Sequence, residues 1–90
     1  MLQINQSSQF RRDVKRQQKR GLDMDKLKKI IIMLAEEKPL PANLYDHSLK
    51  GVWSKYRELH IAPDWLLIYR IDADVLYLTQ TGSHDDLFKE

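Results

Sequence analysis

The segment from His60 to Trp65 combines three side chains that could act on a nucleic acid. It reads His-Ile-Ala-Pro-Asp-Trp, so an imidazole, the carboxylate of Asp64 and a large aromatic ring surround one proline. Only two other histidines occur in the chain, His47 upstream and His84 near its end. If the fold brings the three imidazoles together, the protein has the groups needed to cleave RNA without a metal ion.

Cleavage of RNA through its own 2′-hydroxyl requires a base for that hydroxyl, donors for the charged phosphorane, and an acid for the leaving 5′-oxygen. Histidine suits both proton-transfer roles, because its unperturbed pKa of about 6.5 lies close to neutral pH. We expect His84 to be the acid and either His47 or His60 to be the base, with the other supporting the phosphate. Asp64 is expected to orient an imidazole or to share the base role.

Trp65 and Phe88 are the aromatic residues expected to stack on an unpaired RNA base. Two structural interpretations compete, because a tryptophan in a sheet is more often a core residue and a histidine near a strand end is often structural. The four candidate catalytic residues are also zinc-ligand types. No pair of them has a local ligand spacing such as HExxH, so we do not expect a metal site or any other cofactor.

The length and composition indicate a single globular domain spanning residues 1–90. Hydrophobic residues make up 42% of the chain and charged residues 31%, which is ordinary for a folded protein. The absence of cysteine excludes a disulfide framework and suits a reducing compartment. No apolar run has the length of a signal peptide or of a membrane span, so we expect a cytoplasmic protein without membrane association.

Positive charge is concentrated in the first two thirds of the chain. Residues 1–60 carry thirteen Lys and Arg against seven Asp and Glu, whereas residues 61–90 carry two against six. This distribution favours a polyanionic partner, because each neutralised phosphate releases counterions.

A first helix is expected between Ser7 or Ser8 and Gly21. Its narrow core-facing side would carry Phe10, Val14, Gln17 and Gly21. The opposite half would carry six basic residues, with Asp13 as the only acid: Arg11, Arg12, Lys15, Arg16, Lys19 and Arg20. Like charges four residues apart repel, so we interpret this half as an RNA-binding ridge that contacts phosphates, although a solvated helix face is the alternative.

The later elements follow from periodicity. A second helix, capped by Asp23 or Asp25, would bury four apolar residues and end before Pro39: Leu27, Ile30, Ile31 and Leu34. Residues 39–51 are expected to form a loop, and residues 53–61, 65–71 and 75–81 three antiparallel strands, the second of them central. A capping box of Ser83 and Asp86 predicts a final helical turn at His84.

The predicted fold is therefore α+β: one strand, two helices, a three-stranded antiparallel meander and a short C-terminal helical turn. The helices are expected to cover one face of the sheet.

Three segments, read in order, resemble the YafQ-type toxins of the RelE/ParE superfamily: residues 46–51 (DHSLKG), 60–69 (HIAPDWLLIY) and 81–88 (TGSHDDLF). The resemblance implies a RelE-like fold and a ribosome-dependent mRNA endonuclease, or mRNA interferase, that cuts codons in the A site. It further implies a type II toxin that a cognate, DinJ-like antitoxin holds inactive. The functional positions it implies are His47, His60, Asp64, Trp65, His84 and Phe88.

This chain departs from many RelE-like proteins at Leu66, where they carry an arginine early in the central strand. Without that arginine, stabilisation of the transition-state charge falls to the histidines, and Arg70 is only a secondary RNA-binding candidate. Two other functions remain open at this point. A ParE-like gyrase inhibitor would arrest DNA metabolism rather than translation, and a non-catalytic RNA-binding module would tolerate replacement of His47 and His84.

Overall fold

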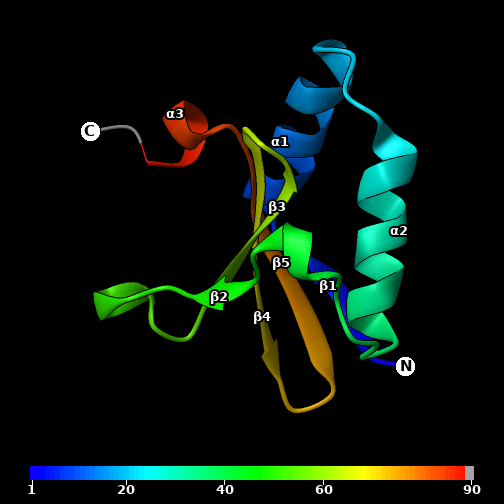
Figure 1. The fold of residues 1–90 in the computed structure, drawn as a ribbon, viewed down its shortest axis with the longest axis vertical. Coiled ribbons are helices and arrows are strands. Elements are labelled where there is room, and N and C mark those ends of the chain that lie inside the picture. The colour runs from blue at the N-terminus through cyan, green and yellow to red at the C-terminus, as the bar shows by residue number, and fades with distance from the viewer. Residues whose placement is uncertain (89–90) are drawn as a thin grey trace.

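A five-stranded sheet is the centre of the computed structural model, which describes residues 1–88; residues 89–90 of the expected domain lie outside that range (Figure 1). The strands are β1 (Gln3–Gln6), β2 (His47–Ser48), β3 (Arg57–Ala62), β4 (Trp65–Asp72) and β5 (Val75–Gly82). Their order in the sheet is β1-β5-β4-β3-β2. β3, β4 and β5 form the predicted antiparallel meander, and β1 pairs with β5 in parallel.

β4 is the central strand, as its apolar composition predicted. All five residues from Trp65 to Tyr69 are buried, so this strand has protein on both faces. Its hairpin to β5 turns at Ala73, which adopts the left-handed conformation with a φ of 53°. This rigid pair runs through the middle of the fold and carries the elements that hold the candidate site.

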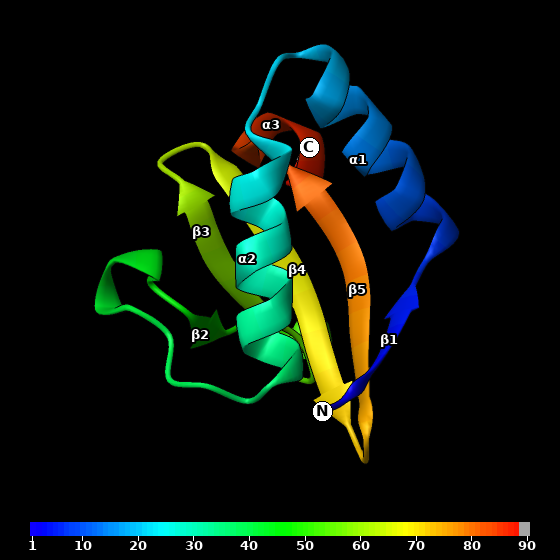
Figure 2. The ribbon, with the colours of Figure 1, turned by 90° about the vertical axis from the view of Figure 1, so that its right-hand side faces the viewer.

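Two helices, α1 (Ser8–Lys19) and α2 (Met24–Ala35), lie on one face of the sheet (Figure 2). Both begin as predicted: the Ser7 side chain accepts from the Phe10 backbone N–H, and the Asp23 side chain caps α2. α2 buries Leu27, Ile30 and Leu34 as predicted, whereas the fourth residue of the predicted stripe, Ile31, is only partly buried. No helix within residues 1–88 is long and apolar enough to cross a membrane.

The prediction that Asp13 lies among the exposed basic residues of α1 is wrong. Asp13 is buried, with 2% of its surface exposed. Its Oδ2 accepts a hydrogen bond from the Thr81 backbone N–H at 3.1 Å, and its Oδ1 accepts from the Gln9 amide at 2.7 Å. β1 pairs with β5 only up to Leu78, so Asp13 satisfies a backbone N–H that β1 is too short to reach.

The segment between α2 and β3 is more ordered than the predicted loop. It contains two short 3₁₀ turns, η1 (Ala42–Leu44) and η2 (Gly51–Trp53), with β2 between them. The predicted strand from residue 53 is wrong at its start, because the Tyr56 N–H bonds to the Trp53 carbonyl and closes a turn there. β3 therefore begins at Arg57 and pairs with β2 over only two residues.

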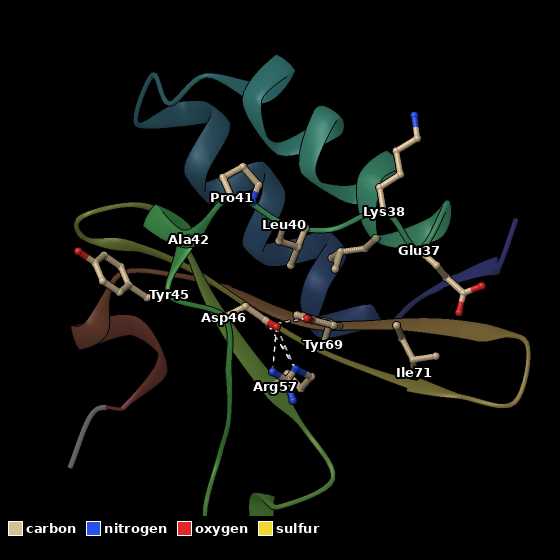
Figure 3. Close-up of a pocket in the computed structure, with 11 residues that line it drawn as sticks. Glu37, Lys38, Leu40, Pro41, Ala42, Tyr45, Asp46, Arg57, Tyr69 and Ile71 are labelled. Atoms are coloured by element: carbon tan, nitrogen blue, oxygen red, sulfur yellow. Dashed lines mark hydrogen bonds and ion pairs between the residues drawn. The ribbon is translucent and has the colours of Figure 1, made fainter.

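A partly buried polar cluster anchors this segment to the sheet (Figure 3). The Tyr69 hydroxyl donates to Asp46 Oδ1 at 2.5 Å, and Arg57 donates to Asp46 Oδ2 through Nε at 3.1 Å and Nη2 at 2.9 Å. Burial, followed by the neighbouring Asp46 carboxylate, raises the pKa of Tyr69, so its hydroxyl remains a hydrogen-bond donor. Since His47 follows Asp46 directly, the cluster also fixes the first histidine of the candidate site.

Candidate active site

The four predicted catalytic residues lie in one row along β3. His47 on β2 pairs across the ladder with Glu58 on β3, and His60 follows two residues later on the same strand. Asp64 lies in the turn between β3 and β4. His84 is the first residue of α3 (His84–Leu87), and its ring centroid is 5.8 Å from that of His60, nearly perpendicular to it. The three imidazoles therefore converge, as the predicted chemistry requires.

Asp64 holds His84 through two hydrogen bonds. The Nδ1 of His84 lies 2.7 Å from Asp64 Oδ1, and the His84 backbone N–H donates to the same oxygen at 3.0 Å. These bonds, the side-chain bond first, lower the pKa of Asp64, so the carboxylate is ionised at neutral pH. An ionised carboxylate only accepts hydrogen bonds, so Nδ1 carries a proton and Nε2 is the atom free to exchange one with a substrate.

His47 is fixed in the same way by a backbone carbonyl. Its Nδ1 lies 2.7 Å from the carbonyl oxygen of Tyr45, which can only accept, so Nδ1 carries the proton. In the neutral ring Nε2 therefore has a free lone pair, which a general base requires. The ring is half exposed, with 51% of its side-chain surface accessible.

Glu58 is a candidate site residue that the sequence analysis missed. Its carboxylate is buried, with 6% of the residue exposed, and Oε1 lies 3.5 Å from His60 Nε2 and 3.8 Å from His47 Nε2. A carboxylate between two imidazoles stabilises either of them as the imidazolium. The available signal was its spacing: Glu58 lies two residues before His60, so both side chains leave β3 on one face.

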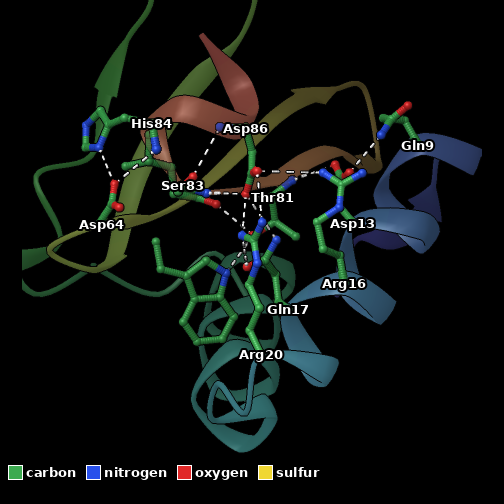
Figure 4. A network of polar contacts seen from close by, with 12 residues as sticks. Gln9, Asp13, Arg16, Gln17, Arg20, Asp64, Thr81, Ser83, His84 and Asp86 are labelled. Carbon is green, nitrogen blue, oxygen red and sulfur yellow. Dashed lines mark hydrogen bonds and ion pairs between the residues drawn. The ribbon is translucent and has the colours of Figure 1, made fainter. Parts of the chain in front are cut away.

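An ion pair connects the turn that carries His84 to Arg20, the residue that caps the C-terminal end of α1 (Figure 4). Arg20 donates through Nη1 to Asp86 Oδ2 at 2.6 Å and through Nη2 to Asp86 Oδ1 at 3.2 Å. The Ser83 backbone N–H donates to Asp86 Oδ2 at 2.9 Å and the Ser83 hydroxyl accepts from the Asp86 N–H, which confirms the predicted capping box. A Cβ on Gly82 would lie 2.8 Å from Asp86 Oδ2, so only glycine leaves room for this carboxylate.

The ion pair predicts an acid-dependent change in stability. Hydrogen bonding by Arg20 holds the pKa of Asp86 well below its usual range. Its stabilising effect is therefore complete above the unfolded-state pKa of about 3.9 and is lost as the pH falls towards the lower folded-state pKa. We expect Asp86→Asn to lower the free energy of unfolding by about 1–2 kcal/mol at pH 7 and by less at pH 3, measured by urea denaturation.

Asp85→Asn is the matched control for Asp86→Asn, since Asp85 is an exposed acid on the same turn. Equal effects of the two substitutions at both pH values would contradict a specific role for the Arg20–Asp86 pair.

The predicted RNA-binding residues differ in exposure, and only the exposed ones can contact RNA. Trp65 is 3% exposed and donates through Nε1 to Thr81 Oγ1 at 3.0 Å, so it is a core residue and the prediction that it stacks on a base is wrong. Phe88 is 46% exposed beside the turn of His84 and remains a stacking candidate. The guanidinium carbon of Arg70 lies 3.9 Å from the centroid of the Tyr77 ring. Arg70 is partly exposed.

The six basic residues of the α1 ridge also differ, because two of them lie next to Asp86. Arg20 is engaged by Asp86, and Arg16 lies 3.8 Å from the same carboxylate, so these two cations are partly neutralised. The other four are exposed on the helix surface and remain candidates for phosphate contact: Arg11, Arg12, Lys15 and Lys19. A helical wheel cannot reveal this division, because Asp86 is 66 residues away from Arg20 in the sequence.

Comparison with known proteins gives one consistent result. A family model described as the bacterial toxin of type II toxin–antitoxin system, YafQ, matches residues 2–89. The mRNA interferase toxin YafQ of Escherichia coli K12 is 45% identical over 86 residues, which cover 94% of each chain.

Solved structures agree with these matches. The E. coli DinJ–YafQ complex contains a chain with a TM-score of 0.91 and 44% identity, covering 98% of this chain and 99% of that one. A copper-bound mutant toxin from Helicobacter pylori has a TM-score of 0.94 and 39% identity, covering 98% of this chain and 100% of that one. Within residues 1–88 of the present chain, no three His, Asp or Glu side chains are arranged to hold a metal ion.

Proposed function

Since the chain belongs to the YafQ family of bacterial toxins of type II toxin–antitoxin systems, we propose that it is an mRNA interferase. Its substrate is mRNA in the A site of a translating ribosome, which it cuts through attack of the 2′-hydroxyl on the neighbouring phosphate. The observation that carries this proposal is the row of side chains along β3, in which His84 with Asp64 stands at one end and His47 with Glu58 at the other.

The order of the row suits an in-line displacement. The attacking 2′-oxygen and the leaving 5′-oxygen lie on opposite sides of the phosphorus, so base and acid must stand at opposite ends of the site. His84, with Nδ1 held by Asp64, protonates the leaving oxygen through Nε2. His60, between the two ends and 5.8 Å from the His84 ring, stabilises the charged phosphorane.

His47 is the base in this assignment. Its Nε2 lone pair takes the proton of the 2′-hydroxyl, and the Glu58 carboxylate, 3.8 Å away, stabilises the imidazolium that forms. Glu58 is at least as close to His60 as to His47, so the preference for His47 rests on its Nδ1–H, which the Tyr45 carbonyl holds, and on its place at the end of the row opposite His84. Glu58 acts through the two imidazoles and is a positioning residue.

The proposed partners follow from charge and from the family. The exposed cations of α1 are suited to a rigid array of phosphates such as ribosomal RNA, because such contacts are independent of base sequence. The related E. coli toxin has been solved in complex with DinJ. We propose that a DinJ-like antitoxin binds and silences this protein in the same way, and that both act in the cytoplasm.

The proposal is tested by comparing free and translated mRNA. We expect the purified protein to cut mRNA in a translation mixture and to leave the same mRNA nearly intact without ribosomes. The products should carry a 2′,3′-cyclic phosphate or 3′-phosphate and a 5′-hydroxyl, because the 2′-oxygen is the nucleophile. EDTA should not inhibit cleavage beyond its effect on ribosomal magnesium.

Three results would count against the proposal. Equal cleavage with and without ribosomes would remove the ribosome from the function. Products with 5′-phosphate ends would indicate metal-activated water rather than the 2′-hydroxyl. DNA damage without translation arrest would instead favour inhibition of gyrase.

A further inference from the structure

A groove of about 490 Å³ opens beside His60, between η1 and the last residues of β3. This volume is typical of pockets that hold small organic ligands. The lining residues that matter here are Lys26, Asn43, Tyr45, His60, Ala62 and Pro63. None of the described lining residues is acidic, which suits a negatively charged occupant.

Tyr45 forms the aromatic wall of this groove under unusual constraints. Its φ of 52° places it in the left-handed region, which is uncommon for a bulky residue and marks a constrained site. In this conformation its carbonyl oxygen holds His47 Nδ1, and its ring lies 5.8 Å from the His60 ring at 60°. Tyr45 is nevertheless 67% exposed, so it contributes little buried area to the core.

The polar groups of the groove are free to bind a ligand. Asn43 and Lys26 both line the groove and are exposed, so the amide and the ammonium are accessible to a ligand. An aromatic face, an amide and a cation together match the face of a base, its hydrogen-bonding edge and its phosphate.

The neighbouring pocket differs in chemistry. It is lined by the acidic Glu37 and by the Asp46–Arg57–Tyr69 cluster, whose polar groups already bond to one another. Figure 3 shows the Tyr45 side chain directed away from that cluster.

We propose that the groove binds one unpaired nucleobase of the mRNA next to the scissile phosphate, with Tyr45 as the residue that stacks on it. This inference rests on the proposed function and extends it by assigning a base subsite to η1 and β3. It also supplies the stacking residue that the buried Trp65 does not provide. The Asn43 amide, which can both donate and accept, is then the group placed to distinguish bases by their edges.

The test uses a short single-stranded RNA with 2′-O-methyl groups, which the enzyme cannot cleave. Titrated into the full-length protein to millimolar concentration, it should shift the NMR signals of Tyr45 and Ala62. Tyr45→Phe should retain binding, because the ring remains. Tyr45→Asn removes the ring while tolerating the left-handed backbone, and should weaken binding by about 5- to 150-fold. Val52→Asn, at a 94% exposed position outside the groove, is the matched control and should bind normally.

Cleavage on programmed ribosomes provides the second measurement. Tyr45→Asn should raise the half-saturating protein concentration while the maximal single-turnover rate stays within a few-fold of wild type. Binding of Tyr45→Asn within two-fold of wild type, or RNA-induced shifts that avoid the groove, would overturn the base subsite even if the wild type cleaves mRNA. If the wild-type protein binds the RNA in the groove but cleaves no mRNA, the base subsite stands and the proposed function is wrong.

Discussion

Replacement of His84 by glutamine should lower the single-turnover cleavage rate on programmed ribosomes by about 10²–10⁴-fold. Glutamine keeps a neutral hydrogen-bond donor of similar size but cannot transfer a proton to the leaving 5′-oxygen. The backbone N–H of residue 84 would still donate to Asp64, and Ser83 would still cap the turn, so α3 should persist. Toxicity should disappear while folding and antitoxin binding remain, as judged by circular dichroism and co-purification.

Asp85→Asn is the control for His84→Gln as well, because it alters the adjacent exposed residue of the same turn without touching the row. It should cleave at close to the wild-type rate. A His84→Gln rate within a few-fold of wild type would remove His84 from the acid role. His84 would then be a structural residue, and His60 would be the next candidate.

Local patterns in the sequence were sufficient for most of the fold. The stripe of Leu27, Ile30 and Leu34 identified α2, and the apolar run of Trp65 to Tyr69 identified the central strand. These predictions succeeded because each depends on a periodicity that one element displays by itself. The Ser83–Asp86 capping box was likewise predictable because both of its residues lie within one turn of the chain.

The parts that could not be predicted depend on residues far apart in the chain. The burial of Asp13 follows from the length of β1, and the engagement of Arg20 follows from the position of Asp86 on α3. β2 is only two residues long, so it has no detectable alternation, yet its pairing with β3 places His47 opposite Glu58. The carboxylate between two imidazoles is therefore visible only in three dimensions.

The assignment of the base predicts distinct pH–rate profiles for two substitutions. With His47 as base and His84 as acid, the wild-type single-turnover rate should rise with pH as the base loses its proton and fall as the acid loses its own. His47→Gln should lower the rate by about 10²–10⁴-fold and abolish the rising part of the profile. His60→Gln should lower the rate by about 10²–10³-fold, as for loss of a transition-state donor, and keep both parts.

Glu58→Gln separates positioning from proton transfer. It keeps the shape of the side chain between His47 and His60 but removes the charge that stabilises the imidazolium. Without that charge the imidazolium that forms on His47 during proton transfer loses its neighbouring carboxylate, so the maximal rate should fall. Loss of the rising part in His60→Gln, with its retention in His47→Gln, would exchange the roles of the two histidines. A Glu58→Gln profile superimposable on the wild type would exclude the carboxylate from the mechanism.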